Sequence, residues 1–574
     1  MNKKNDKNTK KQVLALVGSA WIAIISVAFL IFTAPLSRAQ PARPAAASGV
    51  TSGNPSSATA SPSRASVQLP NLGDGSDMTT SAERRMGDRI AREIYRDPDY
   101  IDDPVLAEYV QGIWQPLLAA ARLRGELNAE LDERFAWEIM MGKDCSVNAF
   151  ALPGGYFGLH LGLVAIVTSR DELASVLGHE LTHVTQRHIS RIIAKQSSQA
   201  PWMIGAMILG ALAASKSPDA ANALIVGGQA VAVQNQLNFS RDMEREADRI
   251  GFGVMTQAGF EPYGFVSMFE KLQQASRLND NGAFPYLRSH PLTTERISDM
   301  QARVPPGARA GRSPSAVLQS LEHTMLAARA NVLSNAGVDA LRAWAALATN
   351  AGFNQLDLPR QAAALYGASF AALKLRDLPS AASLQARLSE MTRADVPAAR
   401  LARLLAVELA LASDDARKAV TLLDGKTGAA AAVQVQVPAP ASGAVSAPAI
   451  ESPAGSGRPE LMLSSQALVR TGQASAAAQQ LQIWVASHPR DAQAWQLLSS
   501  AYAAQGQSLR AIRADAEGQV AHLDYAGALD RFKAAQELAR DLSRRGAADH
   551  IEASIIDTRA RQTSLLLKEQ AVER

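Results

Sequence analysis

Residues 169–185 have the sequence SRDELASVLGHELTHVT, which carries the strongest structural signal in the chain. Ser169 and Glu172 form a capping box, the pattern that starts a helix. On such a helix His179 and His183, four positions apart, extend from the same face, so both imidazoles can reach one metal ion. The segment therefore predicts a helix that carries two metal ligands.

Glu180 lies between these histidines, where it can take a proton from a water molecule without being a ligand. Zn²⁺ suits two neutral imidazoles and one carboxylate, with a fourth position open. A five-residue match to so loose a pattern also arises by chance in long chains. The assignment therefore needs support from the rest of the sequence.

The third ligand has to lie outside this helix. A metzincin would have Gly and His where this chain has Gln186 and Ile189. Downstream, the sequence EREAD begins at Glu244 and predicts a second helix with Glu244 and Asp248 on one face. The alternative is a solvated charged face, but the order and spacing of the two motifs favour a metal site. The predicted centre is one Zn²⁺ per chain held by His179, His183 and Glu244, with Asp248 fixing a ligand imidazole and Glu180 as the catalytic base.

These motifs resemble a known family of zinc metallopeptidases that includes HtpX, the CAAX prenyl endopeptidases and the BepA-like exported proteases. Its hallmarks are the HExxH helix and a later Glu-x-x-Ala-Asp helix, matched here by Glu244, Ala247 and Asp248. The resemblance covers about residues 80–305 and implies a gluzincin-type metalloendopeptidase. Within this family, the export signal and the carboxy-terminal repeats, both described below, make the chain most similar to the BepA-like branch.

The resemblance also implies a substrate strand and a further site histidine. The stretch NAFALPGG, residues 148–155, looks like the edge strand beside the active site of these enzymes. The residues expected to pair with substrate are Asn148, Ala149, Phe150, Ala151 and Leu152. His290, in the sequence SHPL, matches a loop histidine that either occupies the open zinc position at rest or assists the transition state. A single His before Pro in a loop is otherwise usually a surface residue.

Two other residues are expected to have no chemical role. If the first helix runs to about residue 194, His188 lies about 140° around from His183, so it packs or faces solvent. Cys145 is the only cysteine, so it forms no intramolecular disulfide. We expect it to be a small buried side chain.

The amino terminus is typical of an export signal. Five lysines precede an apolar run over residues 13–32, and Ser37-Arg38-Ala39 is a small-x-small cleavage site. Cleavage is favoured, but the run is long enough to span a bilayer, which leaves an uncleaved anchor and membrane contact at this end open. Both arrangements place the remaining chain in the periplasm.

The charge of the chain is concentrated in this segment. The 574 residues have a formal charge of +4, but residues 1–39 alone sum to +5, so the remainder sums to −1. We therefore expect no nucleic-acid partner. With 47% hydrophobic and 20% charged residues the composition is globular.

The remaining pattern predicts a mainly α protein. Residues 81–143 have a helical pattern, residues 150–163 are β-rich, and residues 201–235 form two short apolar arms that serve as a lid or as a packing hairpin. Gly472 and Gly506 lie 34 positions apart, as in tetratricopeptide repeats. We expect an α+β zincin-type metallopeptidase domain, with its HExxH helix and a small edge-stranded sheet, followed by an α-solenoid of such repeats.

The expected organisation has six parts: a signal peptide or anchor (1–39), a flexible linker (40–75), the zinc metallopeptidase domain (76–310), a helical repeat region (311–425), a second linker (426–457) and a tetratricopeptide-repeat region (458–574).

The predicted function is cleavage of unfolded or misassembled polypeptides in the periplasm. By resemblance, this is quality control of outer-membrane protein assembly, and the repeat region docks on the assembly machinery. Two alternatives stay open: a chaperone or scaffold whose protease site is held shut by His290, and an inner-membrane-anchored protease with other clients.

Overall fold

The computed structural model describes residues 78–195, 240–278, 284–305, 320–424 and 457–572. All the described residues lie within one compact unit, residues 72–574. The expected signal segment, almost all of both linkers and the apolar arms at 201–235 lie outside the described residues. The predicted domain boundaries stay predictions.

A four-stranded sheet lies in the first third of the described chain, with the strand order β1-β2-β4-β3. Its strands are β1 (Tyr100–Ile101), β2 (Glu138–Gly142), β3 (Ala149–Leu152) and β4 (Tyr156–His160). β2 and β4 are parallel, and β3 is antiparallel to β4. β3 therefore forms one edge of the sheet, with one side of its backbone facing away from β4.

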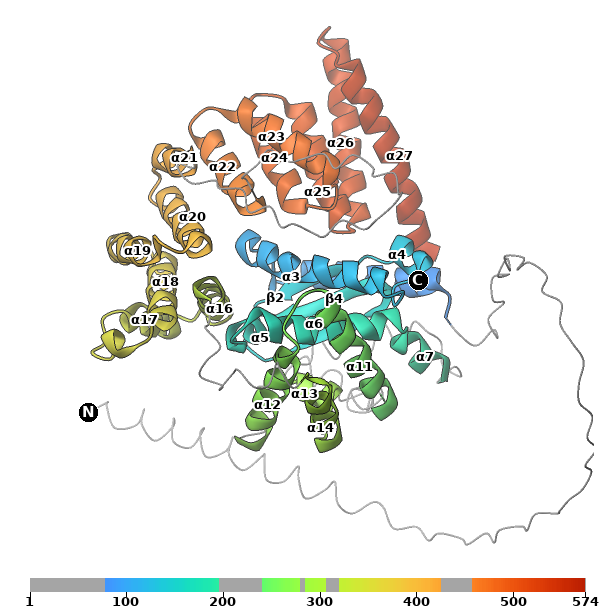
Figure 1. Ribbon diagram of the computed structural model, residues 1–574. Coiled ribbons are helices and arrows are strands. Elements are labelled where there is room, and N and C mark those ends of the chain that lie inside the picture. Colours follow the sequence, from blue (N-terminus) through green and yellow to red (C-terminus); the bar gives the residue numbers. More distant parts are fainter. Residues whose placement is uncertain (1–77, 196–239, 279–283, 306–319, 425–456, 573–574) are drawn as a thin grey trace, which may run out of the picture. The chain divides into compact units, whose positions relative to one another are not determined.

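Helices make up the rest of this part of the described chain, and only some of them lie against the sheet (Figure 1). The helices of this part are α2 (Thr80–Arg96), α3 (Pro104–Leu123), α4 (Ala129–Arg134), α5 (Leu161–Ile166), α6 (Arg170–Thr185), α7 (His188–Lys195), α11 (Arg241–Gln257), α12 (Tyr263–Leu278), α13 (Tyr286–Ser289) and α14 (Thr294–Arg303). α6 contacts strand β3 and packs against α3, α11 and α12. It is therefore the central helix of this part of the chain.

The start of α6 follows the sequence prediction closely. The side chain of Ser169 accepts a hydrogen bond from the backbone N–H of Glu172. The Glu172 carboxylate, however, accepts from the N–H of Thr168 rather than of Ser169, and Lys271 pairs with it. The cap is therefore tied to α12 as well as to the helix start.

Two predicted element bounds are wrong. The stretch 81–143 is not helical throughout, because residues 138–142 form strand β2 and complete the sheet beside β4. The helix from Ser169 ends at Thr185 rather than near residue 194. Arg187 adopts a left-handed conformation with φ 53°, which interrupts the helix before α7.

Helices alone form the remaining described chain. They are α16 (Leu321–Ser334), α17 (Val338–Leu347), α18 (Leu358–Lys374), α19 (Leu378–Thr392), α20 (Val396–Ala412), α21 (Ala416–Asp424), α22 (Arg458–Arg470), α23 (Ala474–Ser487), α24 (Ala492–Ala504), α25 (Ser508–Ala521), α26 (Tyr525–Arg544) and α27 (His550–Val572). Gly472 and Gly506 have φ of 79° and 72° at equivalent turns, between α22 and α23 and between α24 and α25. The mainly α fold with a small sheet is confirmed, whereas the assignment of these helices to the tetratricopeptide family stays a prediction.

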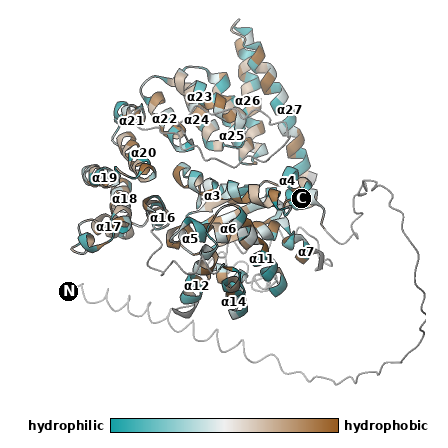
Figure 2. Ribbon diagram, in the orientation of Figure 1, coloured by the Kyte–Doolittle hydropathy of each residue, from teal (hydrophilic) through white to brown (hydrophobic). Residues whose placement is uncertain are grey.

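One cluster of buried apolar side chains extends from Val105 in α3 to Leu423 in α21 and on to Ala467 in α22. The residues before 305 and the helices α16 to α22 therefore share a core. Within the described ranges, no helix is both long and apolar enough to cross a bilayer. Figure 2 shows that the longest of them, α27, carries hydrophilic and hydrophobic residues along its whole length.

Candidate metal centre

Two glycines bring the helices of the site together. A Cβ added to Gly251 of α11 would lie 2.9 Å from the carbonyl oxygen of Gly178 in α6, so only glycine permits this approach. Gly178 directly precedes His179, and Ser240 caps α11 just before Glu244. The close crossing therefore brings the second motif to the first. The sequence contains both glycines, but nothing in it predicts that they face each other.

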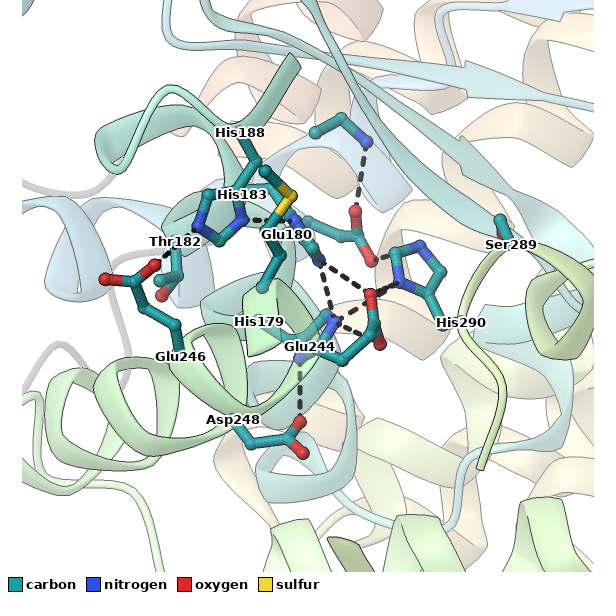
Figure 3. A network of polar contacts seen from close by, with 12 residues as sticks. His179, Glu180, Thr182, His183, His188, Glu244, Glu246, Asp248, Ser289 and His290 are labelled. Carbon is teal, nitrogen blue, oxygen red and sulfur yellow. Dashed lines mark hydrogen bonds and ion pairs between the residues drawn. The ribbon is translucent and has the colours of Figure 1, made fainter. Parts of the chain in front are cut away.

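Four side chains converge at this crossing, namely His179, His183, Glu244 and His290. Each offers one nitrogen or oxygen atom, and these four atoms all lie within 4.8 Å of one another. Nε2 of His179 lies 3.0 Å from Nε2 of His183, and Oε1 of Glu244 lies 3.0 Å from Nδ1 of His290. All four residues are buried. Their side chains point toward one another (Figure 3).

The cluster has the chemistry of a zinc site. Three imidazole nitrogens and one carboxylate oxygen match the nitrogen and oxygen ligands that Zn²⁺ prefers. Burial, followed by the neighbouring charges, lowers the pKa of His183 well below its ordinary value, which favours the neutral imidazole that a metal requires. The residues therefore fit a bound zinc ion.

The far side of His179 faces a carboxylate. Its Nδ1 lies 3.0 Å from Oδ1 of Asp248, and Arg296 binds the same carboxylate through Nε and Nη2 at 2.7 and 2.8 Å. Burial raises the pKa of Asp248, but hydrogen bonds from Arg296 and His179 outweigh it and hold the pKa below its ordinary value. Asp248 is therefore an anion placed to fix the tautomer of His179.

Arg296 is a site residue that the sequence reasoning missed. Its Nη1 lies 2.7 Å from Oε2 of Glu244 and donates to the carbonyl oxygen of Pro291 at 2.9 Å. One buried guanidinium therefore holds Glu244, Asp248 and the loop after His290 together. No motif in the sequence distinguishes it from the other arginines.

Glu180 joins the cluster to the edge strand. Its Oε2 accepts a hydrogen bond from the backbone N–H of Ala151 at 3.0 Å, and its Oε1 lies 3.4 Å from Nε2 of His290. Of the other predicted strand residues, Asn148 directly precedes β3, and Ala149, Phe150 and Leu152 lie in it. The structure thus brings the predicted strand beside Glu180.

His290 lies inside the cluster. Its ring stacks on Tyr286 at 4.7 Å between centroids, and it is 2% exposed, so it is not a surface residue. Burial lowers the pKa of its imidazole, but the carboxylates of Glu244 and Glu180 outweigh this and raise the pKa above its ordinary value.

The structure corrects one other expectation and extends a second. Cys145 is exposed rather than buried. His188 is fully buried and contacts His183, because the break at Arg187 turns it back toward that side chain. Of the two expected positions, packed or facing solvent, His188 is packed, and its contact with His183 was not expected because the angle was calculated for an unbroken helix.

A HExxH helix beside an edge strand, with an acidic ligand from a second helix, defines a zincin-type metallopeptidase domain. Comparison with known proteins agrees. Residues 108–304 match the model of Peptidase family M48, so this part of the chain is similar to that family.

Individual relatives resemble a longer part of the chain. A protein of Vibrio cholerae is 33% identical over 327 residues, which are 56% of this chain and 63% of that relative. The beta-barrel assembly-enhancing protease of Escherichia coli is 30% identical over 314 residues, which are 53% of this chain and 59% of that protease. The mitochondrial metalloendopeptidase OMA1 of Saccharomyces cerevisiae is 29% identical over 201 residues, covering 34% of this chain and 55% of the relative. The chain thus spans less than two thirds of the length of each.

Proposed function

We propose that this chain is a zinc-dependent endopeptidase that cleaves unfolded or misassembled polypeptides in the periplasm. The observation that carries the proposal is the convergence of four buried donor atoms within 4.8 Å, next to a glutamate that contacts an edge strand. The names of the bacterial relatives support a role in quality control of outer-membrane protein assembly.

His179, His183 and Glu244 would hold the metal ion. When bound, zinc would lower the pKa of a water molecule and polarise the scissile carbonyl group. Glu180 would accept a proton from the attacking water at its carboxylate and pass it to the nitrogen of the leaving amine. Asp248 would keep the Nδ1 proton of His179 in place, which leaves Nε2 free to act as a ligand.

The substrate would bind as an added strand on β3. In an antiparallel pair, residues alternate between hydrogen-bonded and non-hydrogen-bonded positions. The N–H of His160 donates to the carbonyl oxygen of Asn148, so the backbone groups of Ala149 and Ala151 face away from β4. The Ala151 N–H already donates to Glu180 and Ala149 is fully buried, so the Ala151 carbonyl is the group that remains for an extended peptide. Such binding selects chains that can be extended and places little demand on their sequence.

A second candidate function is a chaperone or scaffold with a self-inhibited protease site. The position of His290, 3.0 Å from Glu244 and 3.3 Å from His179, supports it, because this imidazole could occupy the fourth zinc position at rest. The helices after residue 320 would then carry the main activity by binding other proteins, including the assembly machinery.

Proteolysis of one protein in two states tests the proposal. The purified zinc-loaded chain should cleave reduced and alkylated lysozyme but leave native, disulfide-bonded lysozyme intact, and the chelator 1,10-phenanthroline should stop cleavage. Equal cleavage of both forms would contradict selection of extended chains. Cleavage that persists in the chelator would contradict a zinc enzyme.

A further inference from the structure

A series of hydrogen-bonded polar side chains lies behind His183, on the side of its ring that points away from the metal position. Nδ1 of His188 lies 2.9 Å from Nδ1 of His183, and Nε2 of His188 lies 3.0 Å from Oε2 of Glu246. Nε2 of His183 faces the opposite way, toward His179 and Glu244. His188 therefore contacts the nitrogen of His183 that is not available to the metal (Figure 3).

The break after α6 produces this contact. Arg187 has φ 53°, a left-handed conformation that is costly for a residue with a side chain. Glu83 holds Arg187 in place by accepting hydrogen bonds from its Nε and Nη2 at 3.2 and 3.0 Å. The structure thus maintains an unfavourable backbone conformation that directs His188 toward His183.

The protons on the rings of His183 and His188 can be assigned in one consistent way. If Nε2 of His183 is the metal ligand, its Nδ1 carries the proton and donates to Nδ1 of His188. His188 is then protonated at Nε2 and donates to the carboxylate of Glu246. Arg191 pairs with that carboxylate at 3.1 Å and keeps it in place.

We infer that His188 and Glu246 are positioning residues for the zinc ligand His183. This rests on the proposed metallopeptidase function. The two ligand imidazoles are then supported differently, since Asp248 reaches His179 directly, whereas Glu246 reaches His183 through a second ring. His188 is 0% exposed, so bulk water does not reach this position. The ring of His188 is therefore the acceptor for the Nδ1 proton of His183.

A ligand role for His188 does not fit the distances. Its Nδ1 contacts Nδ1 of His183 and its Nε2 contacts Glu246, so neither ring nitrogen of His188 points into the metal cluster. A pure packing role would be filled equally well by phenylalanine, which has a similar ring but no acceptor. Substitution by phenylalanine therefore separates the two roles.

The test is the dissociation constant of Zn²⁺ for the full-length chain, measured by competition with a chelating dye. Loss of a residue that supports a zinc ligand typically weakens metal binding about 10–100-fold. We expect His188→Phe to fall in this range and Glu246→Ala, which leaves the buried ring in place, to show a smaller loss. His188→Asn, whose side-chain oxygen can accept the same hydrogen bond, should bind zinc more tightly than His188→Phe.

His323→Phe is the matched control. His323 is also buried and bridges two elements, with Nδ1 2.6 Å from the hydroxyl of Tyr109 and Nε2 2.8 Å from the carbonyl oxygen of Val167. This variant should unfold at a lower temperature yet bind zinc like the wild type. Wild-type affinity in both His188→Phe and Glu246→Ala would overturn the inference, as would equal weakening in His188→Asn and His188→Phe. If the wild-type chain binds no zinc, the proposed function itself fails.

Discussion

The carboxylate of Glu180 accepts a hydrogen bond from the backbone N–H of Ala151 at 3.0 Å. This contact joins the HExxH helix to the edge of the sheet, so the proposed base and the proposed substrate strand have a fixed relation to each other. The same carboxylate faces His290 at 3.4 Å. The proposed proton acceptor therefore lies between the strand that would hold the substrate and the side chains that would hold the metal.

Glu180→Gln tests the role of this carboxylate. The amide cannot accept a proton, so cleavage of reduced and alkylated lysozyme should fall about 10²–10⁴-fold. Zinc content should stay at the wild-type value, because Glu180 is not a proposed ligand. Retention of wild-type cleavage, with zinc bound, would contradict its assignment as the base.

His290→Ala tests whether the loop histidine restrains the enzyme. If His290 occupies the fourth position at rest, its removal should increase cleavage several-fold, since no competing imidazole remains. A decrease in the turnover number at unchanged zinc content would instead assign His290 to the transition state. Steady-state kinetics with a fluorogenic peptide distinguishes these outcomes.

Arg296→Met tests the buried guanidinium. It leaves two buried carboxylates, Asp248 and Glu244, without their cation, and breaking such a pair typically costs about 3–5 kcal/mol. Arg303→Met on the same helix removes a partly exposed pair with Asp299 and should cost less than about 1 kcal/mol. Urea unfolding of the two metal-free variants measures both values, and equal losses would contradict a special role for Arg296.

The acid sensitivity of folding should depend on Asp103. Burial raises the pKa of this carboxyl, but the guanidinium of Arg329 and the N–H of Leu106 outweigh it and hold the pKa below its ordinary value. A lowered pKa contributes stability above the unfolded-state pKa near 4, and this stability is lost as the pH falls through the folded-state pKa.

Asp103→Asn should therefore lower the melting temperature at pH 7 and reduce the additional loss between pH 5 and pH 3. Asp339→Asn, which changes a fully exposed carboxylate, should keep the wild-type profile. A wild-type profile in Asp103→Asn as well would show that the pair with Arg329 does not govern acid stability.

Local patterns in the sequence predicted the individual helices of the site better than the packing of these elements against one another. The cap at Ser169 and the placing of His179 and His183 on one face depend on spacing along a single helix, which the sequence contains directly, whereas Glu244 reaches them through the crossing of α6 and α11. Strand β2 was missed because its pairing with β4 is a contact between distant residues, and a short apolar run has no distinctive period.

The environment of His188 and Arg296 could not be predicted for a related reason. The position of His188 depends on the left-handed Arg187, which Glu83 of another helix holds in place. That of Arg296 depends on how α14 packs against α11. Both positions depend on contacts between separate helices, which the helical periodicity of a sequence does not specify.

Metal analysis of the purified full-length chain and of His179→Ala is the most direct test of the central claim. We expect one zinc ion per wild-type chain and almost none in the variant, because His179 would provide one of three ligands and is itself held by Asp248. Equal zinc content in the two proteins, or no zinc in the wild type after exposure to Zn²⁺, would contradict the assignment of this cluster as the metal centre.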